Sequence, residues 1–197
     1  MFNHTDKLPT DVYGVTVDTA KIARLFWSAE DAVALDADGV MTSKAGKTSK
    51  QTVTDGLTSP AVPRALEVVV GGTGRDAKAS STVVIKGTNI EDKPISETFT
   101  LTGDKTETLV GTKAFKTVSS VEIDAQDGTG VTFTVGWTNK LGLPFAWSEK
   151  HIAFATLNGT RETTDPTLAV SSEAIEANTI TLNSALDGHA VEVYFIV

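Results

Sequence analysis

Alternation of apolar and polar side chains limits the fold of this chain more than any other feature. Across residues 131–137 every odd position is apolar or aromatic, and every even position is threonine or glycine. Residues 95–102 and 121–124 alternate similarly, and turn signals such as Gly71 and Gly72 separate the segments. A period of two indicates β-strands, and a threonine-rich second side is typical of antiparallel sheets that face water. The pattern predicts a mainly β fold, with an antiparallel β-sandwich or barrel-like central domain over residues 58–144.

Residues 1–57 have a weaker pattern, and we expect them to form an extended, partly helical N-terminal arm. Residues 18–27 fit a short amphipathic turn of helix. Ser28 and Asp31 have the spacing of a capping box, which predicts a second brief helix that ends at Leu35. Residues 42–55 are rich in lysine, serine and threonine, so they are expected to form an exposed loop or arm.

The C-terminal segment, residues 145–197, returns to the β pattern and is expected to pack with the central domain. Residues 179–183 and 190–197 flank a turn and predict a terminal hairpin. In the last strand Val191 and Phe195 fall on one side, and Tyr194 falls on the other. Because both sides carry large apolar groups, this strand must be buried in a sheet, within this chain or against a neighbour.

Composition excludes several classes of protein. The 197-residue chain is 40% hydrophobic, enough for a packed core, and it has no cysteine for disulfides or thiolate metal sites. A formal net charge of −8 argues against binding to a phosphate backbone. No apolar run is long enough to span a bilayer, and no secretion signal is visible at the N-terminus. We therefore expect neither a nucleic acid nor a membrane as a partner.

Three short motifs resemble nucleotide or metal sites but lack the surroundings that such sites need. Residues 72–77 match a dinucleotide fingerprint, yet a new strand begins at residue 82, too soon for a crossover helix. We interpret this stretch as a glycine-rich hairpin loop. Residues 45–48 resemble the end of a phosphate-binding loop, with Met41 where its first glycine belongs. Residues 36–47 open like a calcium loop but end in lysine instead of a bidentate acid, so we expect no metal and no cofactor.

The sequence gives no sign of catalytic machinery. Its three histidines, His4, His151 and His189, are far apart and have no metal-ligand spacing. There is no G-x-S-x-G elbow and no cysteine nucleophile. We expect a protein that is not an enzyme, although a triad built from distant residues is defined by geometry and stays open at this point.

Aromatic residues provide the candidate contacts with other proteins. Trp137 lies on the apolar side of its strand and is expected in the core. Phe26, Trp27 and Trp147 lie in weakly patterned segments, where a core position and a partner contact are equally compatible with the sequence. Because aromatic side chains are enriched at interface anchors, Phe26, Trp27, Trp147 and Tyr194 are our candidate partner-contact residues.

The order of phrases in the central segment carries a resemblance to a known class of proteins. These phrases occupy residues 58–64, 84–89, 95–101, 111–118 and 139–144. In this order they resemble virion structural proteins of tailed double-stranded-DNA bacteriophages, in particular capsid decoration and head-associated proteins. The resemblance covers residues 58–144 well, the C-terminal segment loosely and residues 1–57 very little. It brings no catalytic residues with it.

The resemblance implies a capsid decoration, or cement, protein that binds the outer surface of the assembled head and stabilises it. The implied partners are the major capsid protein, copies of the chain itself, or both, with a trimer favoured by shell symmetry. The implied location is the capsid surface of the virion, after synthesis in the cytoplasm of the host bacterium. A head-fibre, tail-tube or baseplate component is an alternative. A carbohydrate-binding or adhesion β-sandwich, with Phe145 and Trp147 as an exposed platform, is an alternative of another class.

Overall fold

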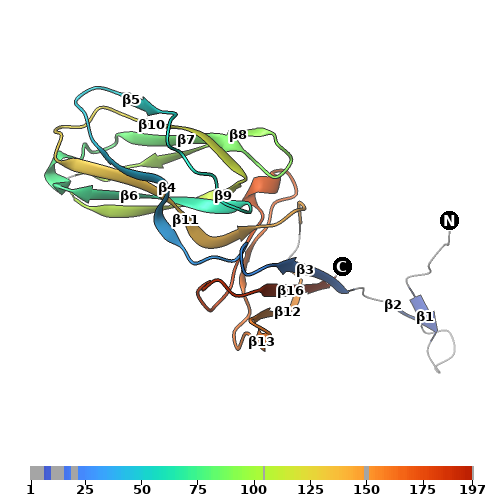
Figure 1. Ribbon diagram of the computed structural model, residues 1–197. Helices are drawn as coiled ribbons and strands as arrows, with labels where there is room; N and C mark the ends of the chain where they lie inside the picture. Colours follow the sequence, from blue (N-terminus) through green and yellow to red (C-terminus); the bar gives the residue numbers. More distant parts are fainter. Residues whose placement is uncertain (1–6, 10–15, 19–21, 104, 149–150, 197) are drawn as a thin grey trace.

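The regular secondary structure of the described chain consists almost entirely of antiparallel strands. The computed structural model describes residues 7–9, 16–18, 22–103, 105–148 and 151–196, and within these ranges the only helical elements are two 3-10 turns of three residues each (Figure 1). Strands β1 (Lys7–Pro9) and β2 (Thr16–Asp18) form a two-stranded sheet. The remaining strands form three larger sheets. The expectation of a mainly β fold is confirmed.

Two of these sheets face each other as a sandwich. The four-stranded sheet has the order β5 (Gln51–Val53), β10 (Thr117–Ile123), β7 (Thr82–Thr88), β8 (Pro94–Thr100). The six-stranded sheet has the order β14 (Thr167–Ala169), β15 (Thr179–Thr181), β11 (Val131–Gly142), β6 (Arg64–Gly72), β9 (Glu107–Phe115), with β4 (Asp36–Ala45) also pairing with β11. Figure 1 shows the two layers stacked on each other.

The first hydrophobic core fills the space between these layers. Val131, Phe133 and Val135 of β11 point into it and are fully buried, whereas Thr132 and Thr134 lie on the other side of the strand. From the opposite sheet, Ile85 and the apolar residues of β8 and β10 meet them. A strand with one side in the core and the other towards water requires a two-residue alternation of apolar and polar side chains. The alternation in the sequence therefore predicted this strand and its buried side correctly.

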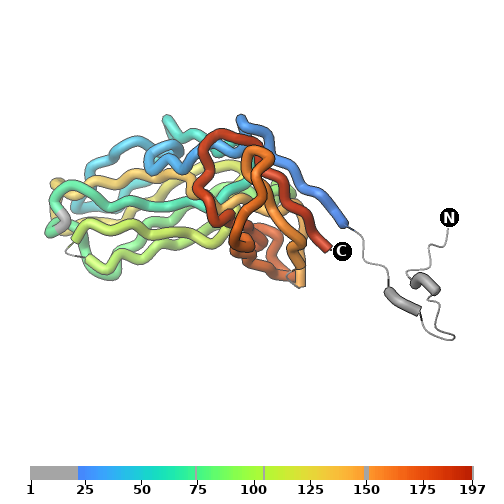
Figure 2. Tube along the Cα trace, turned by 90° about the horizontal axis from the view of Figure 1, so that it is seen from below, coloured from blue at the N-terminus to red at the C-terminus, as the bar shows by residue number. Residues whose placement is uncertain are grey.

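The third sheet lies at one end of the sandwich and encloses a second core. Its order is β13 (Thr160–Arg161), β12 (Ile152–Leu157), β16 (Val191–Ile196), β3 (Ile22–Trp27). Figure 2 shows β3 and β16, from opposite ends of the chain, running side by side. Trp27, Leu141 and Phe195 are buried in the second core. Because Leu141 belongs to β11, that strand runs through both cores.

The helices expected before residue 36 are wrong for the residues that the structure describes. Ile22–Trp27 is a strand, because it pairs along its full length with β16. The capping-box hydrogen bonds between Ser28 and Asp31 do form. The Ser28 backbone N–H donates to the Asp31 carboxylate, and the Asp31 backbone N–H donates to the Ser28 hydroxyl. These bonds close a single turn. The helix does not continue, because the next backbone carbonyl groups accept hydrogen bonds from side chains elsewhere in the fold instead of from helical N–H groups. The Arg64 guanidinium donates to the oxygen of Val33, and the Trp137 indole donates to that of Ala34.

The rest of the predicted arm is also largely strand where it is described. Residues 42–55, expected to be a loop, include the end of β4 and all of β5, which pair with β11 and β10. Their polar composition reflects a position at the sheet edges, where most of these side chains are exposed. Apart from β1 and β2, the part of the arm before Ile22 lies outside the described residues.

The predicted terminal hairpin is wrong, although the burial of the last strand is confirmed. β15 pairs with β11 and β14, whereas β16 pairs with β12 and β3 of the same chain. Asn178 directs β15 towards β11. The oxygen of its buried side-chain amide accepts hydrogen bonds from the backbone N–H groups of Trp147 and Ser171. Its backbone carbonyl oxygen accepts a hydrogen bond from the backbone N–H of Leu143. This tertiary anchor overrides the local turn signal.

Residues 72–77 do not form the predicted hairpin loop. A single 3-10 turn, η1 (Gly74–Asp76), follows β6, and the next strand, β7, belongs to the opposite sheet of the sandwich. The stretch is therefore a short connection between two layers. The side chain of Asp76 holds it by accepting a hydrogen bond from the backbone of Gly130 at 2.7 Å. The long crossover helix of a dinucleotide fold is likewise not formed here.

Candidate functional site

The four candidate partner-contact residues lie on two sides of the third sheet. Trp27 is only 7% exposed and packs in the second core. Trp147 is half-buried against the same core, with its ring edge-on to Phe195 at 4.4 Å between centroids. Phe26, by contrast, is 55% exposed, and Tyr194 is half-buried on the side that faces away from the core. Trp27 is thus a core residue and Trp147 packs against the core on the inner side, whereas Phe26 and Tyr194 lie on the side that is open to a partner.

Strand register brings Phe26 and Tyr194 together on one surface. Phe26 is opposite Glu192, and Arg24 is opposite Tyr194, which in turn is opposite Phe154 on its other side. Residues directly opposite each other share a side of the sheet. We call the surface so formed the outer face, and it comprises Ile22, Arg24, Phe26, Phe154, Arg161, Glu192, Tyr194 and Ile196.

Ionic and aromatic contacts hold the side chains of the outer face in place. Arg24 forms an ion pair with Glu192 at 2.5 Å, and the Tyr194 hydroxyl donates to the same carboxylate at 3.0 Å. This hydrogen bond raises the pKa of Tyr194. The rings of Phe154 and Tyr194 stack with centroids 4.3 Å apart and an angle of 20° between their planes. Side chains that are already fixed lose little conformational freedom when a partner binds.

Both arginines of this surface lie over aromatic rings. The Arg24 guanidinium carbon is 5.3 Å from the centroid of Phe26, and that of Arg161 is 5.1 Å from the centroid of Phe154. Such cation–π contacts keep the cations close to the sheet and leave a surface that is both apolar and charged. Arginine and aromatic residues are the types most enriched at protein interfaces.

Exposed apolar side chains gather on the outer face. Six large hydrophobic side chains are markedly exposed in the described part of the chain, and three of them, Ile22, Phe26 and Ile196, belong to the outer face. Two more, Val33 and Leu35, follow β3 closely in the sequence, whereas the sixth lies on β9. Exposed apolar side chains gathered on one face mark an interaction site more often than scattered single residues do.

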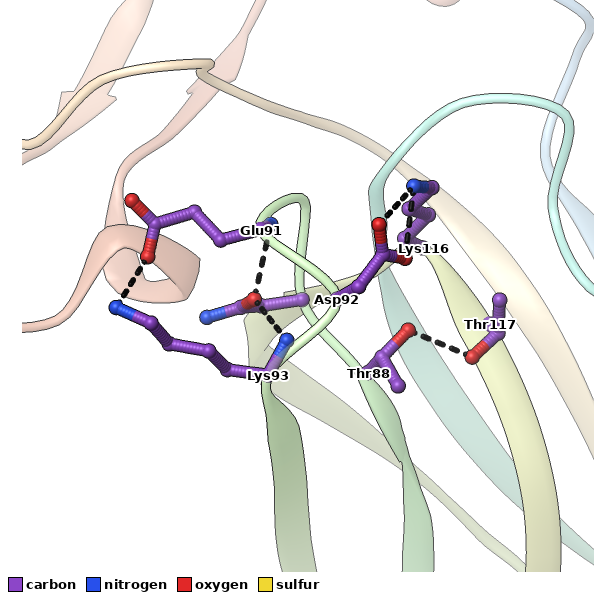
Figure 3. Close-up of polar contacts among 7 residues, drawn as sticks. Thr88, Glu91, Asp92, Lys93, Lys116 and Thr117 are labelled. Atoms are coloured by element: carbon purple, nitrogen blue, oxygen red, sulfur yellow. Dashed lines mark hydrogen bonds and ion pairs between the residues drawn. The ribbon is translucent and has the colours of Figure 1, made fainter.

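A groove of about 450 Å³ lies between the β7–β8 loop and the 3-10 turn η2 (Ile175–Ala177). The loop is braced by its own contacts and by Lys116 of the β9–β10 connection, as Figure 3 shows. Lys116 donates to both carboxylate oxygens of Asp92, at 2.8 and 2.9 Å, and Lys93 pairs with Glu91 at 2.7 Å. The Asn89 amide closes the turn through the backbones of Glu91 and Lys93. Because these charged side chains pair with one another, we interpret the loop as a structural element and not as a ligand site.

The remaining candidate sites lack the required geometry. His189 pairs with Asp187 on an exposed turn, and His4 lies outside the described residues. No group of histidine and acidic residues in the described chain has the arrangement of a metal site. Phe145 and Trp147, the expected carbohydrate platform, are half-buried with their ring centroids 4.7 Å apart. Both rings pack edge-on against Phe195, at 6.0 and 4.4 Å between centroids, instead of forming an exposed platform.

Comparisons with known proteins give no match to a family model, to a curated protein or to a solved structure. Among the described residues, no helix has the length and the apolar character needed to cross a membrane.

Part of the outer face could be found from the sequence, and part could not. Alternation in residues 191–196 placed Glu192, Tyr194 and Ile196 on one side. Ile22 and Arg24 were missed because their segment was interpreted as helix, although they alternate with Ala23 and Leu25 in the same period. Phe154 and Arg161 were missed because only the pairing of β12 and β13 brings them there; their sequence carries no separate signal.

Proposed function

We propose that this chain is a virion structural protein of a tailed double-stranded-DNA bacteriophage, a capsid decoration protein that binds the assembled head through the outer face. The observation that carries the proposal is the concentration of exposed apolar and aromatic residues on one preorganised side of the third sheet. The resemblance of residues 58–144 to head-associated proteins supports the choice of partner. In this role the chain acts by binding and not by catalysis.

The composition of the outer face suits a protein partner. Phe26 and Ile22 supply exposed apolar area, while Arg24 and Glu192 neutralise each other in an ion pair. Interfaces of this kind derive most of their affinity from a few aromatic and arginine side chains. Phe26 is therefore expected to be the main anchor.

Binding to the assembled shell would stabilise it by mass action. A ligand that binds only the expanded form of a shell lowers the free energy of that form relative to all others. Repetition over many equivalent sites then multiplies a modest free energy of binding for each copy. The effect would oppose the pressure of packaged DNA from the outside of the head.

The test is cosedimentation of the purified chain with empty expanded heads and with unexpanded procapsids of the phage that encodes it. We expect the chain to pellet with expanded heads only. The variant Phe26→Ser should lose about 30-fold in affinity, as removal of an interface anchor does. Val110→Ser is the matched control, because Val110 is 49% exposed on β9, outside the outer face, and its affinity should be unchanged.

Pelleting with neither particle would refute the decoration role. Pelleting that Phe26→Ser leaves intact would refute the outer face as the binding surface. In that case the Val110→Ser result shows whether β9 carries the contact.

A further inference from the structure

β3 is an open edge of the third sheet. It pairs with β16 on one side, and no described strand pairs with it on the other. All six of its residues, Ile22–Trp27, are in unbroken register with β16. A regular edge strand exposes a row of unpaired N–H and C=O groups, which is a template for another strand.

The other edges in the described chain are short or blocked. β1, β2, β5, β13 and β14 have three residues or fewer. β8 and β9 protect each other, because the Glu97 carboxylate accepts the backbone N–H of Thr112 at 2.7 Å, and Lys113 donates to the carbonyl of Ser96. β4 has two register shifts against β11 and an exposed lysine at position 44. Bulges, lysines and short length are the usual means of blocking an edge, and β3 has none of them.

The direction of the free backbone groups on β3 follows from the ladder. Ile196 donates its backbone N–H to His151, on the β12 side of β16. Residues of an antiparallel strand bond alternately to one neighbour and to the other. Ile196 and Ile22 are therefore a pair without hydrogen bonds, and the backbone groups of Ile22, Arg24 and Phe26 point to the open edge.

We propose that the open edge of β3 pairs antiparallel with β3 of a second copy of this chain, with Leu25 on the two-fold axis. Only registers that match even-numbered residues with even-numbered ones can form the hydrogen bonds. The register centred on Arg24 would place two like charges opposite each other, which is unfavourable. The register centred on Leu25 places Arg24 opposite Phe26 of the second copy and small Ala23 opposite large Trp27.

Charge and shape thus make this strand complementary to itself. The Arg24 guanidinium, which already lies 5.3 Å from the centroid of its own Phe26 ring, gains a second aromatic face from the other copy. The same contact occurs twice by symmetry, as an isologous interface requires. Leu25 meets Leu25 at the centre, and both are half-buried beside the second core.

The pairing joins the third sheet of one copy, with its four strands, to the third sheet of the other copy, and the result is one sheet of eight strands. The two-fold axis of an antiparallel edge pair is perpendicular to the sheet, so the outer faces of both copies lie on the same side. The dimer would then present a doubled surface, and two linked contacts bind more tightly than one. This consequence rests on the proposed function, but the pairing itself does not.

Disulfide trapping tests the register directly, since the chain has no cysteine of its own. In the proposed dimer the two Leu25 Cα atoms form a pair without hydrogen bonds, about 4.5 Å apart, within the range that a disulfide spans. Leu25→Cys should therefore give a covalent dimer under mild oxidation. Ala23→Cys is the matched control, because its two copies would lie about 14 Å apart along the strand and should not cross-link.

Sedimentation velocity tests the role of the backbone. Arg24→Pro removes one outward N–H, which an edge strand tolerates, so the variant should keep the circular dichroism of the fold and sediment as a monomer. Arg24→Ala keeps the N–H but loses the aromatic contacts and the ion pair with Glu192 of the same copy, so it should weaken the dimer by about tenfold without abolishing it. An unmodified chain that stays monomeric at its highest soluble concentration, with no cross-link at Leu25→Cys, would overturn the pairing. Cross-linking of Ala23→Cys instead would overturn the register, and neither outcome depends on binding to heads.

Discussion

Truncation of Phe195 tests whether the two cores form one cooperative unit. Phe195 is fully buried on β16, and its ring is edge-on to Trp147 and Phe145, with centroids 4.4 and 6.0 Å away. Replacing a buried phenylalanine with alanine costs about 3–5 kcal/mol. Two aromatic contacts of favourable geometry place Phe195→Ala near the upper end of that range, about 4–5 kcal/mol.

Urea unfolding followed by two probes measures this cost. For a chain of this length an m-value of about 2.5 kcal/mol per molar urea converts the loss into a fall in the midpoint of about 1.5–2 M. Tryptophan fluorescence is weighted towards the second core, with Trp27 and Trp147 there and Trp137 beside the first core, and far-UV circular dichroism reports on all strands. Because β11 crosses both cores, the two probes should give the same midpoint, with m unchanged.

The control is Ile196→Ala, the next position on β16, which points outwards and is 42% exposed. It should shift the free energy of unfolding by about 0.5 kcal/mol. Equal losses for the two variants would contradict the assignment of inner and outer sides. Two separate transitions in Phe195→Ala would show that β11 does not couple the cores.

Two further outcomes follow from single contacts. Hydrogen bonds from Lys50 and Lys86 lower the pKa of Glu122 from 4.5 to about 2. The contribution of Glu122 to the free energy of unfolding is therefore present above pH 4.5 and is lost as the pH falls towards 2. When the pH is lowered over this window, the unfolding midpoint should therefore fall less steeply in Glu122→Gln than in the unmodified chain. Equal slopes would contradict the pairing of Glu122 with the two lysines. In Gly136→Ala the new methyl carbon would lie 1.8 Å from a carbonyl oxygen of β4, so we expect a loss of more than about 4 kcal/mol or no folded protein. Thr134→Ala, on the same strand, should remain folded with a small change in melting temperature, and similar losses in both variants would rule out this close approach as the cause.

Sequence patterns predicted strands well where one side of the strand is in the core and the other is in water. Residues 131–135 are the clearest case, because each apolar residue there is fully buried. Residues 22–27 failed because their apolar positions fit a helical period as well as a period of two. Pairing with β16, far away in the sequence, decided between them, and no local signal encodes that pairing.

The candidate site was predicted in the same partial way. Phe26 and Tyr194 were chosen for their residue type, and the fold brings them to the same surface. Trp27, the neighbour of Phe26, was chosen on the same ground and lies in the core. Residue type alone cannot distinguish the two positions, because alternation along β3 sends adjacent side chains to opposite sides of the sheet.

The pairing of β3 with β16 also sets the order in which the chain can fold during translation. Arg24 and Glu192, which meet on the outer face, are 168 residues apart. The strands of the sandwich lie between them, so most of that domain can fold while the ribosome is still adding residues. The outer face has to wait until β16 has emerged. A chain cut short by a nonsense codon would therefore lack this surface even if its sandwich had folded, and defective copies would be kept out of any assembly that depends on it.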